Sequence, residues 1–441
     1  MTLAENIGVK IPEILLPKPN IDHTKWSVIA CDQFTSEPEY WEKVAGIVGE
    51  APSTFHLILP EVWLKTPDID QRIRDTQTTM RNYLKGEVFD VYEGMVLVER
   101  SFGNKTRTGL MLALDLEKYD YHTGSQTLIR ATEGTILDRL PPRMKVRRGA
   151  PLECPHIMVL YDDPNQTVLA EVLKRKDDFP VLYDFDLMEG SGHLFGRLIS
   201  RKPILDSIIS ALAALIEPTT YVSKYGLTDD LAPLLFAVGD GNHSLATAKA
   251  IWEELKPYVR PDHPARYALV EIVNLHDQAL EFEAIHRVLF NADNDFIAKM
   301  QSFFKSDCTL SDVGEMDTLA RLVNQTAQSR QQFGILQADG YTLVELKNRR
   351  QALAAGNLQE FLDVYLTEHS GASIDYVHGT ETVERLGKVP GNIGFFLPPI
   401  LKDSFFRTVI VDGALPRKTF SMGKAEEKRF YMECRLISDQ V

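Results

Sequence analysis

A short apolar segment, a glycine-containing turn and a helix follow one another between Leu234 and Leu255. Residues 234–238 are continuously apolar, which is typical of a strand that is buried on both faces. Gly239 and Gly241 then allow positive φ angles and let a ligand approach the backbone closely. The pattern predicts a strand, a tight turn and a helix in direct succession, with the turn at the N-terminus of the helix.

The turn also carries the chemistry of an anion site. The free N–H groups and the positive dipole end of the helix point at it, where an anion is stabilised. Asp240, Asn242 and His243 add an acid, an amide and an imidazole. The turn lacks the Gly-Lys-Ser/Thr ending of a P-loop and the third glycine of a dinucleotide fingerprint. A phosphate site and a structural turn, in which Asp240 caps the helix and His243 packs, both fit this spacing, and the two side-chain donors favour the phosphate site.

Composition narrows the class of protein. A chain of 441 residues is too long for one simple core, so two or three domains are expected. The formal net charge of −14 argues against a nucleic-acid partner, because nucleic acids bind to basic surfaces. There is no signal-peptide pattern and no apolar run of membrane-spanning length, which predicts a cytoplasmic protein without a membrane partner. Nothing in the composition excludes a homo-oligomer.

Four cysteines are scattered along the chain without metal-ligand spacing. They are predicted to be free thiols in a reducing cytosol, at Cys31, Cys154, Cys308 and Cys434. Cys31 has no adjacent basic group, so we interpret it as buried and not as a nucleophile.

Hydrophobic periodicity predicts a mixed order of hairpins and helices, which favours an α+β (mixed α/β) fold over a uniform βαβ array. The predicted strands cover residues 26–31, 55–59, 95–98, 110–114, 157–161, 181–185 and 267–275, with a further hairpin over 333–346. The predicted helices cover residues 36–48, 66–85, 203–216 and 358–368. We expect an N-terminal α+β domain over 1–125, a central domain with the turn over 126–300, and a C-terminal α+β portion over 301–441.

A second polar cluster lies between Arg130 and Arg139. Glu133 is flanked there by threonines and the two arginines, and a carboxylate in such surroundings can act as a general base toward a phosphate-bearing or amino-acid substrate. An exposed loop with surface ion pairs, which contribute little stability, explains the same residues.

Three further groups are candidates for a ligand cleft. His276-Asp277 and His286-Arg287 flank an apolar segment, at a spacing that matches no common metal pattern. Asp32 follows a predicted strand, and polar residues past the carboxyl end of a strand contact ligands in open sheets. A turn or a helix cap explains Asp32 equally well.

These clusters, in this order, resemble a large bacterial domain-of-unknown-function family, numbered ten-fifteen and often labelled ParB/Spo0J-like, over nearly the whole chain. The family's Asp-Gly-His-His-Arg turn, between a strand and a helix, is similar to residues 240–244, which are Asp-Gly-Asn-His-Ser. Its other elements are similar to residues 132–135 (Thr-Glu-Gly-Thr) with Arg139, residues 285–287 (Ile-His-Arg) and residues 415–419 (Leu-Pro-Arg-Lys-Thr). More remotely, the family resembles the ParB/sulfiredoxin superfamily, which includes kinases of free serine.

The resemblance implies a ParB/sulfiredoxin-like core, elaborated with hairpins and helices, and phosphate chemistry that involves ATP or ADP and Mg²⁺. Two positions depart from the family pattern. Asn242 replaces its first histidine and Ser244 replaces its arginine, a residue that would clamp a phosphate with two hydrogen bonds. Phosphate affinity must therefore come from backbone N–H groups, His243 and arginines elsewhere.

The leading hypothesis is a small-molecule phosphotransferase, a nucleotide-dependent kinase of serine or a similar hydroxy-amino acid. The alternatives are a nucleotide- or metabolite-binding regulator without catalysis and a phosphometabolite hydrolase. Asp240 would also hold Mg²⁺. Phosphate binding is assigned to Gly239, Gly241, Asn242, Ser244 and Arg139, catalysis to His243, Asp240 and Glu133, and substrate binding to His286, Arg287 and Asp32.

Overall fold

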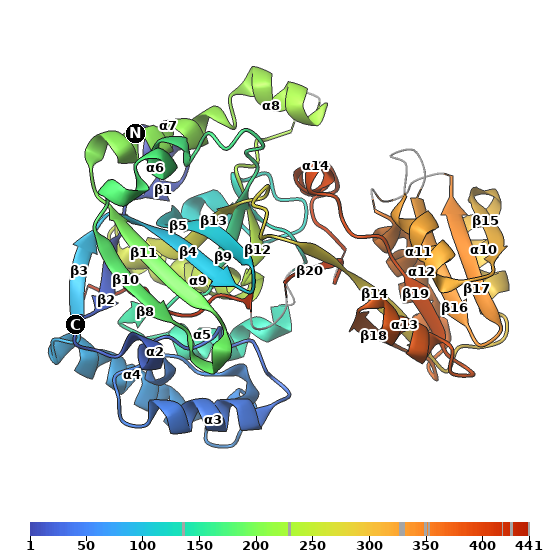
Figure 1. The fold of residues 1–441 in the computed structure, drawn as a ribbon, viewed down its shortest axis with the longest axis horizontal. Coiled ribbons are helices and arrows are strands. Elements are labelled where there is room, and N and C mark those ends of the chain that lie inside the picture. The colour runs from blue at the N-terminus through green and yellow to red at the C-terminus, as the bar shows by residue number, and fades with distance from the viewer. Residues whose placement is uncertain are drawn as a thin grey trace. The chain divides into compact units, whose positions relative to one another are not determined.

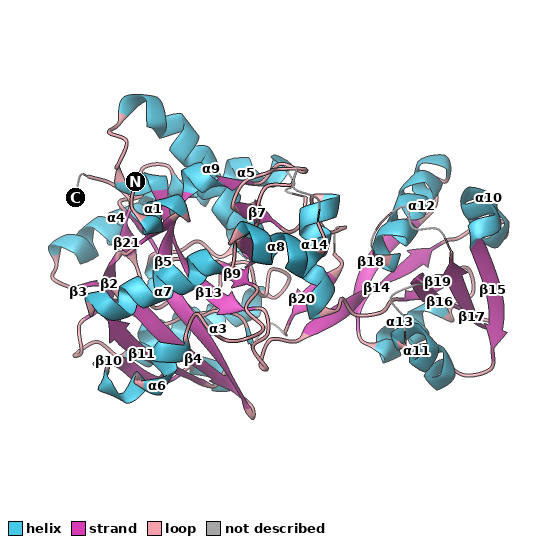
Figure 2. Ribbon diagram, turned by 90° about the horizontal axis from the view of Figure 1, so that it is seen from above, coloured by secondary structure: helices cyan, strands magenta, loops and turns pink. Residues whose placement is uncertain are grey.

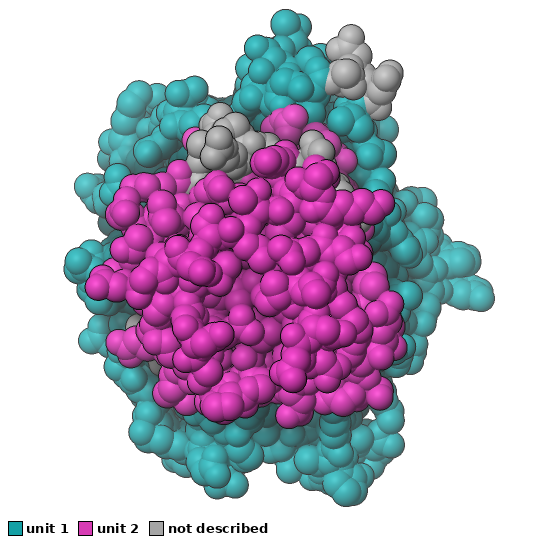
Figure 3. All heavy atoms as spheres, turned by 90° about the vertical axis from the view of Figure 1, so that its right-hand side faces the viewer, with its two compact units in different colours: residues 1–280, 423–441 teal, residues 281–422 magenta. Residues whose placement is uncertain are grey.

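The computed structural model describes residues 1–134, 137–227, 231–325, 331–347, 351, 353–416, 418–423 and 427–439. Two residues of the family-like motifs, Thr135 and Arg417, lie outside these ranges. The chain forms two compact units (Figure 1, Figure 3): unit 1 comprises Met1–Leu280 and Gly423–Val441, and unit 2 comprises Glu281–Met422. Both units combine helices with β-sheet, so the mixed α/β class expected from the sequence is confirmed.

The units do not follow the boundaries expected near residues 125 and 300. Residues 423–439 return to unit 1 after unit 2, because their strand β21 (Arg435–Leu436) pairs with β8 (Leu152–Glu153). Composition does not reveal such a return, since it depends on pairing between segments far apart in the sequence. Unit 2 is therefore an insertion between two parts of unit 1.

A central sheet organises unit 1. In the described part of the chain its strand order is β10-β11-β4-β5-β13-β9-β12-β7-β6, with β1 beside β5. The pairs β13–β9, β12–β7 and β7–β6 are parallel, so β7 and β12 end at the same edge of the sheet. The bounds of these strands are β1 Val9–Lys10, β4 Met95–Phe102, β5 Lys105–Asp115, β6 Tyr119–Asp120, β7 Ile129–Ala131, β9 Met158–Tyr161, β10 Val181–Asp186, β11 His193–Ile199, β12 Phe236–Asp240 and β13 Tyr267–Asn274.

Both faces of this sheet are covered. Successive side chains of β4 point to opposite faces: Met95 and Leu97 belong to one apolar core, and Val96 and Val98 belong to the other. The first core is closed by α7 (Lys202–Ala214) and α9 (Asn242–Leu255), and the second by α2 (His23–Trp26), α3 (Pro38–Val48), α4 (Ile69–Lys85) and residues 430–437. The remaining elements of unit 1 include α1 Leu3–Asn6, α5 Leu140–Arg147, α6 Ala170–Lys174, α8 Pro218–Tyr225 and the paired strands β2 Glu13–Pro17 and β3 Phe89–Glu93.

Most of the elements expected from periodicity are present, including the β4–β5 hairpin and helices α3, α4 and α7. The strands expected at residues 26–31 and 55–59 are wrong. Residues 23–26 form α2, whose N-cap Asp22 accepts hydrogen bonds from two backbone N–H groups. Residues 54–56 form a 3₁₀ turn after Ser53. Both apolar segments are largely buried, but their backbone groups bond locally or through isolated contacts, and they do not enter a strand ladder.

Unit 2 is an antiparallel sheet between two helical layers (Figure 2). Its described strand order is β15-β17-β16-β19-β14-β18, with β20 beside β14. Helices α10 and α12 pack in one apolar core, and α11 and α13 pack in the other. The bounds are β14 Phe282–Phe290, α10 Phe296–Phe304, β15 Cys308–Val313, α11 Met316–Asn324, β16 Gln331–Gln337, β17 Gly340–Leu346, α12 Ala354–Glu368, β18 Ser373–His378, α13 Thr380–Gly387, β19 Ile393–Phe396, α14 Lys402–Asp412 and β20 Phe420–Met422.

A buried ion cluster anchors the C-terminal segment in unit 1. Arg429 is 4% exposed and pairs with Glu271 of β13 and with Glu433. Tyr183 of β10 donates a hydrogen bond to Glu433, and Arg107 of β5 lies 3.5 Å from Glu271. Removing one partner of such a cluster leaves an uncompensated buried charge, which is strongly destabilising. The cluster therefore determines where residues 427–437 cross the sheet.

In the described part of the chain, no single helix is long and apolar enough to cross a membrane. Only together do α7 and α8 reach the length and apolar composition of a membrane span, and the two helices are bent by 53° relative to each other. Side chains of α7, among them Ile208 and Leu212, pack in the core of unit 1.

Replacing Arg429 by methionine should destabilise unit 1 by about 3–5 kcal/mol, because Glu271 and Glu433 would remain buried without the guanidinium that pairs with both. All four tryptophans, residues 26, 41, 63 and 252, belong to unit 1, so tryptophan fluorescence during urea unfolding reports on this unit. Arg260→Met breaks an exposed ion pair with Asp439 and is the matched control, with an expected cost below about 1 kcal/mol. Equal urea midpoints for wild type and Arg429→Met would show that the cluster does not anchor the segment.

Candidate active site

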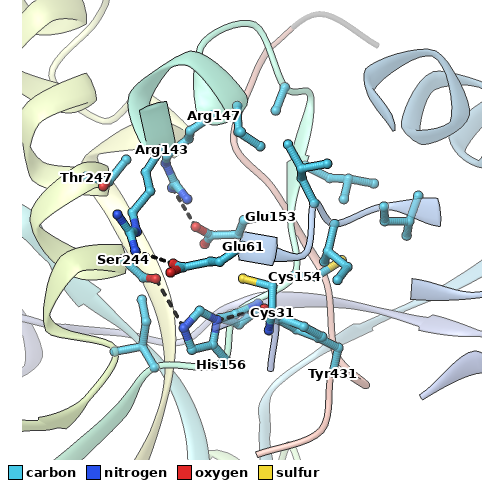
Figure 4. A pocket seen from close by; sticks show the side chains of 18 of the residues that line it. Cys31, Glu61, Arg143, Arg147, Glu153, Cys154, His156, Ser244, Thr247 and Tyr431 are labelled. Carbon is cyan, nitrogen blue, oxygen red and sulfur yellow. Dashed lines mark hydrogen bonds and ion pairs between the residues drawn. The ribbon is translucent and has the colours of Figure 1, made fainter. Parts of the chain in front are cut away.

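A pocket of about 140 Å³ opens in unit 1 beside the start of α9 (Figure 4). An apolar lining with a few convergent polar groups is the usual make-up of a small-molecule site. The apolar lining includes Leu57, Ile58, Leu59, Leu64, Met80, Val146, Ala150, Leu152 and Ile157. The polar lining includes Cys31, Glu61, Arg143, Arg147, Glu153, Cys154, His156, Ser244, Thr247 and Tyr431.

His156, just before β9, lies close to polar groups from three segments of the chain. Its Nδ1 is 2.8 Å from the Tyr431 hydroxyl, and its Nε2 is 3.2 Å from Ser244 Oγ and 3.7 Å from Asp32 Oδ2. The Tyr431 hydroxyl also accepts a hydrogen bond from Cys31 N. Segments from the N-terminal region, from α9 and from the C-terminal region thus meet at one imidazole.

Glu61 and Arg143 form a half-buried ion pair in the same lining (Figure 4). Glu61 begins a 3₁₀ turn over Glu61–Trp63, and Arg143 comes from α5. Burial raises the pKa of Glu61 despite the opposing charge of Arg143, and the nearby Asp32 carboxylate raises it further. A carboxyl group with a raised pKa in a pocket is a candidate for general acid–base chemistry.

The predicted turn joins β12 to α9 and adjoins the pocket. Gly241 has a φ of 78°, and a Cβ at this position would lie 3.1 Å from Cα of Ile157, so the turn requires glycine. Asp240 Oδ2 is 3.1 Å from Lys428 Nζ of the C-terminal segment. Burial alone would raise the pKa of Asp240, but the charges of Lys428 and His156 outweigh it and lower that pKa below its usual value. Asp240 is therefore a carboxylate at neutral pH.

The two polar clusters predicted from the sequence come together through β7 and β12. These strands are parallel neighbours, so the residues that follow them share one edge of the sheet. Thr132 N donates to Asn242 Oδ1 over 3.3 Å, and the Thr132 hydroxyl donates to the carbonyl of Val238 over 2.6 Å. Asn242, which replaces the family's first histidine, thus ties the turn to the Thr132 segment.

Several other predicted site residues lie near this edge without lining the pocket. His243 is in the first turn of α9, where its carbonyl accepts a hydrogen bond from the Thr247 hydroxyl. Glu133 follows Thr132 and is half-buried. Arg139 is exposed at the end of the 3₁₀ turn Leu137–Arg139, and its carbonyl accepts a hydrogen bond from Arg143. The roles assigned to these residues stay predictions.

His286 and Arg287 belong to unit 2 and are buried in β14. The ring of His286 stacks on Phe396, and its Nδ1 accepts a hydrogen bond from Leu397 N over 3.1 Å. The Arg287 guanidinium lies over the ring of Tyr376 and donates to a carbonyl of its own strand. These contacts give both side chains a structural part in the sheet, and their substrate role stays a prediction.

His276 and Asp277 follow β13 in unit 1. His276 Nε2 lies 2.7 Å from Asp162 Oδ1, whose second oxygen accepts a hydrogen bond from Tyr225 over 2.6 Å. Asp277 accepts a hydrogen bond from Thr108 N over 2.9 Å. Asp162 follows β9, the parallel neighbour of β13, whereas His156 precedes β9, so this cluster and the pocket lie at opposite ends of that strand.

Sequence reasoning missed most of the polar lining. His156 stands next to a predicted strand, as Asp32 does, and this position is the one feature of the sequence that marks it as a candidate site residue. Glu61 and Arg143 have no local pattern that marks them. Lys428 and Tyr431 belong to the C-terminal segment, and only its return to unit 1 brings Tyr431 to the pocket and Lys428 to Asp240.

Fold and site together define an α+β protein with a polar-lined pocket at a helix N-terminus. A family model described as a protein of unknown function, DUF1015, matches residues 15–365, and the chain belongs to this family. No curated protein matches.

Three solved structures are similar to the chain at low identity. A variant of a free serine kinase in complex with AMP has 9% identity and a TM-score of 0.40, over 75% of this chain and 92% of that one. A conserved hypothetical protein from Pyrococcus furiosus has 10% identity and a TM-score of 0.36, over 74% and 95%. SbnI with a C-terminal truncation, from Staphylococcus aureus, has 11% identity and a TM-score of 0.26, over 62% and 83%.

The buried imidazole of His286 should make unit 2 sensitive to acid. Burial and the charges of Arg287 and His378 lower its pKa from 6.5 to about 4. Between these values the unfolded chain binds a proton that the folded chain does not, so stability falls by about 3 kcal/mol as the pH drops through this window. An NMR titration of the ring should give a midpoint near 4, and His286→Gln should remove this part of the acid sensitivity. A midpoint above 6 would contradict the burial of a neutral ring.

Proposed function

We propose that the unit 1 pocket binds the phosphate groups of a nucleotide and that the protein transfers a phosphoryl group to the hydroxyl of a small metabolite. Serine or a similar hydroxy-amino acid is the first candidate acceptor. One observation carries the proposal: Ser244 of the first turn of α9, the imidazole of His156 and the guanidinium of Arg143 line one pocket that also has an apolar wall. Phosphoryl transfer needs mainly positioning and the stabilisation of negative charge, which such groups supply.

The phosphates would contact backbone N–H groups in the first turn of α9, a helix of 14 residues whose dipole favours negative charge there. Arg143 adds a guanidinium that Glu61 holds in place, in a position to make charge-assisted hydrogen bonds. The hydroxyls of Ser244 and Thr247 add neutral donors. These groups replace the arginine that the family pattern has at the position of Ser244.

Asp240 is the residue that would hold Mg²⁺. Carboxylate oxygens are the protein ligands that Mg²⁺ prefers, and it usually takes one or two of them together with substrate phosphates. The lowered pKa of Asp240 supports this fit, since a metal ligand must be deprotonated. When bound, the ion would neutralise charge on the phosphate oxygens.

We assign acceptance of the proton to Asp32. The acceptor hydroxyl attacks the terminal phosphorus, the bond from that phosphorus to the nucleotide breaks, and the hydroxyl proton passes to Asp32. His156 lies beside this carboxylate, with Nε2 3.7 Å from Asp32 Oδ2. We place the ring hydrogen on Nε2, because Tyr431 already accepts a hydrogen bond from Cys31 N and can give its own hydrogen to Nδ1. Nε2–H then faces Asp32 and Ser244.

The sequence-based roles of Glu133 as a base, of His243 as a catalytic residue and of Arg139 as a phosphate ligand remain alternatives within this proposal. A ParB/sulfiredoxin-like core and a cytoplasmic location belong to it as well. The net charge of −14 supports a small-molecule substrate over a nucleic acid.

Incubation with ATP or ADP, Mg²⁺ and a panel of hydroxy-amino acids should give a phosphorylated acceptor, detected by mass spectrometry. Asp32→Asn should lower kcat by about 10²- to 10⁴-fold, because the general base is lost while the shape is kept. Asp206→Asn makes the same change in an exposed ion pair of α7 and should leave kcat unchanged.

The outcomes of this assay separate the alternatives. Nucleotide binding without any product would support a regulator and overturn the transferase. Release of phosphate at the same rate with and without an acceptor would support a hydrolase. Absence of both turnover and nucleotide binding would overturn the phosphate site itself.

Removing the charged pair Arg143 and Glu61 together, as Arg143→Met with Glu61→Gln, should weaken nucleotide binding by about 10- to 100-fold, because charge-assisted hydrogen bonds to phosphate are lost. Isothermal titration calorimetry measures the change in Kd. The matched control is Arg148→Met with Glu254→Gln, which removes an exposed ion pair outside the pocket lining. Equal affinities for both double variants would contradict a phosphate-binding role of Arg143.

A further inference from the structure

Two thiols from distant parts of the sequence lie together at the pocket wall. Sγ of Cys154 is 2.8 Å from Sγ of Cys434, although the residues are 280 positions apart. Cys154 is half-buried and lines the pocket, whereas Cys434 is fully buried. Both belong to unit 1, so their proximity is a property of one compact unit.

The strand register explains this proximity. Strands β8 and β21 are antiparallel, with Glu153 opposite Arg435. One position further along, Cys154 therefore lies opposite Cys434. Opposite residues of antiparallel strands have Cα atoms about 4.5–5.5 Å apart. This range falls within the roughly 4.4–6.8 Å that a disulfide spans, so the backbone is placed for a bond.

Further contacts hold Cys434 at this position. Its backbone N–H donates to the carbonyl of Leu15 over 2.9 Å, and its carbonyl accepts from Leu15 N over 2.8 Å. Arg435 next to it donates to Glu153 over 2.9 Å. Backbone hydrogen bonds of Cys434 and the Arg435–Glu153 contact thus hold the two sulfur atoms close together.

We propose that the Cys154–Cys434 thiol pair is a redox modification site that hydrogen peroxide converts to a disulfide. Cys154 attacks the peroxide, the O–O bond breaks, and a sulfenic acid and one water form. Cys434 then attacks the sulfenic sulfur, the S–S bond forms and a second water leaves. The two thiols lose two electrons in total, and the peroxide is reduced to two molecules of water.

The surroundings determine the order of these steps. Cys154 lines the pocket and is the member of the pair that a small oxidant reaches. Burial raises the pKa of Cys434, so its sulfur remains a thiol until the sulfenic acid is next to it. Cys31 also lines the pocket, but burial and the Asp32 carboxylate raise the pKa of its thiol, and no second sulfur is bonded to it in the described part of the chain.

The disulfide would join the pocket wall to the C-terminal segment. That segment carries Tyr431, which contacts His156, and Lys428, which contacts Asp240. Oxidation would therefore fix covalently the contact between the wall and the segment that completes the pocket. This inference does not depend on the reaction catalysed there.

Titration with hydrogen peroxide, followed by denaturation and maleimide labelling, tests the inference on the full chain. Two of the four thiols should be lost, and peptide mass spectrometry should find residues 154 and 434 in one cross-linked species that dithiothreitol releases. The melting temperature of the oxidised protein should rise by about 5 °C or more, because the bond closes a long loop of the unfolded chain.

Cys154→Ser should abolish the cross-link and the rise in melting temperature, whereas Cys308→Ser in unit 2 is the matched control and should keep both. Since Cys434→Ser replaces a fully buried group, the half-buried Cys154 is the better site for the test. Four reactive thiols after treatment, or a cross-link that includes Cys31, would overturn the inference.

Discussion

The burial of Arg429 between Glu271 and Glu433 is the interaction on which the pocket of unit 1 depends. It holds the C-terminal segment against the sheet after the chain has completed unit 2. Lys428, one residue earlier, then reaches Asp240, and Tyr431, two residues later, reaches His156. The buried ion cluster thus fixes the C-terminal segment, and the segment in turn positions Lys428 and Tyr431. The free-energy cost of desolvating the charges of the cluster is offset by their pairing.

The electrostatics of the pocket follow from this arrangement. Two ion pairs lie near His156, since Arg143 pairs with Glu61 and Lys428 pairs with Asp240. Within each pair the two charges therefore compensate each other before any ligand arrives. A phosphate group that enters would take over hydrogen bonds that these carboxylates now make, which frees their oxygens for a cation or for a proton.

The sequence predicts the local part of this architecture well. The strand–turn–helix around Gly241 depends on neighbouring residues, and the structure contains it, with the positive φ that glycine allows. The meeting of Thr132 with Asn242 follows from the parallel pairing of β7 with β12, and hydrophobic periodicity did not predict β7. The strand expected at residues 55–59 is wrong. The backbone N–H of Phe55 donates a hydrogen bond to the hydroxyl oxygen of Ser53, and this local bond favours a 3₁₀ turn over a strand. His156, Glu61 and Tyr431 could not be assigned to one site from the sequence, since contacts among segments hundreds of residues apart leave no periodic pattern.

A crystal structure with a non-hydrolysable ATP analogue and Mg²⁺ is the most direct test of the central claim that this pocket binds nucleotide phosphates. We expect the terminal phosphates within hydrogen-bond distance of the backbone N–H groups of residues 242–244, beside His156 and Arg143. A nucleotide bound elsewhere on the protein, or bound in this pocket with its phosphates away from the start of α9, would contradict the account.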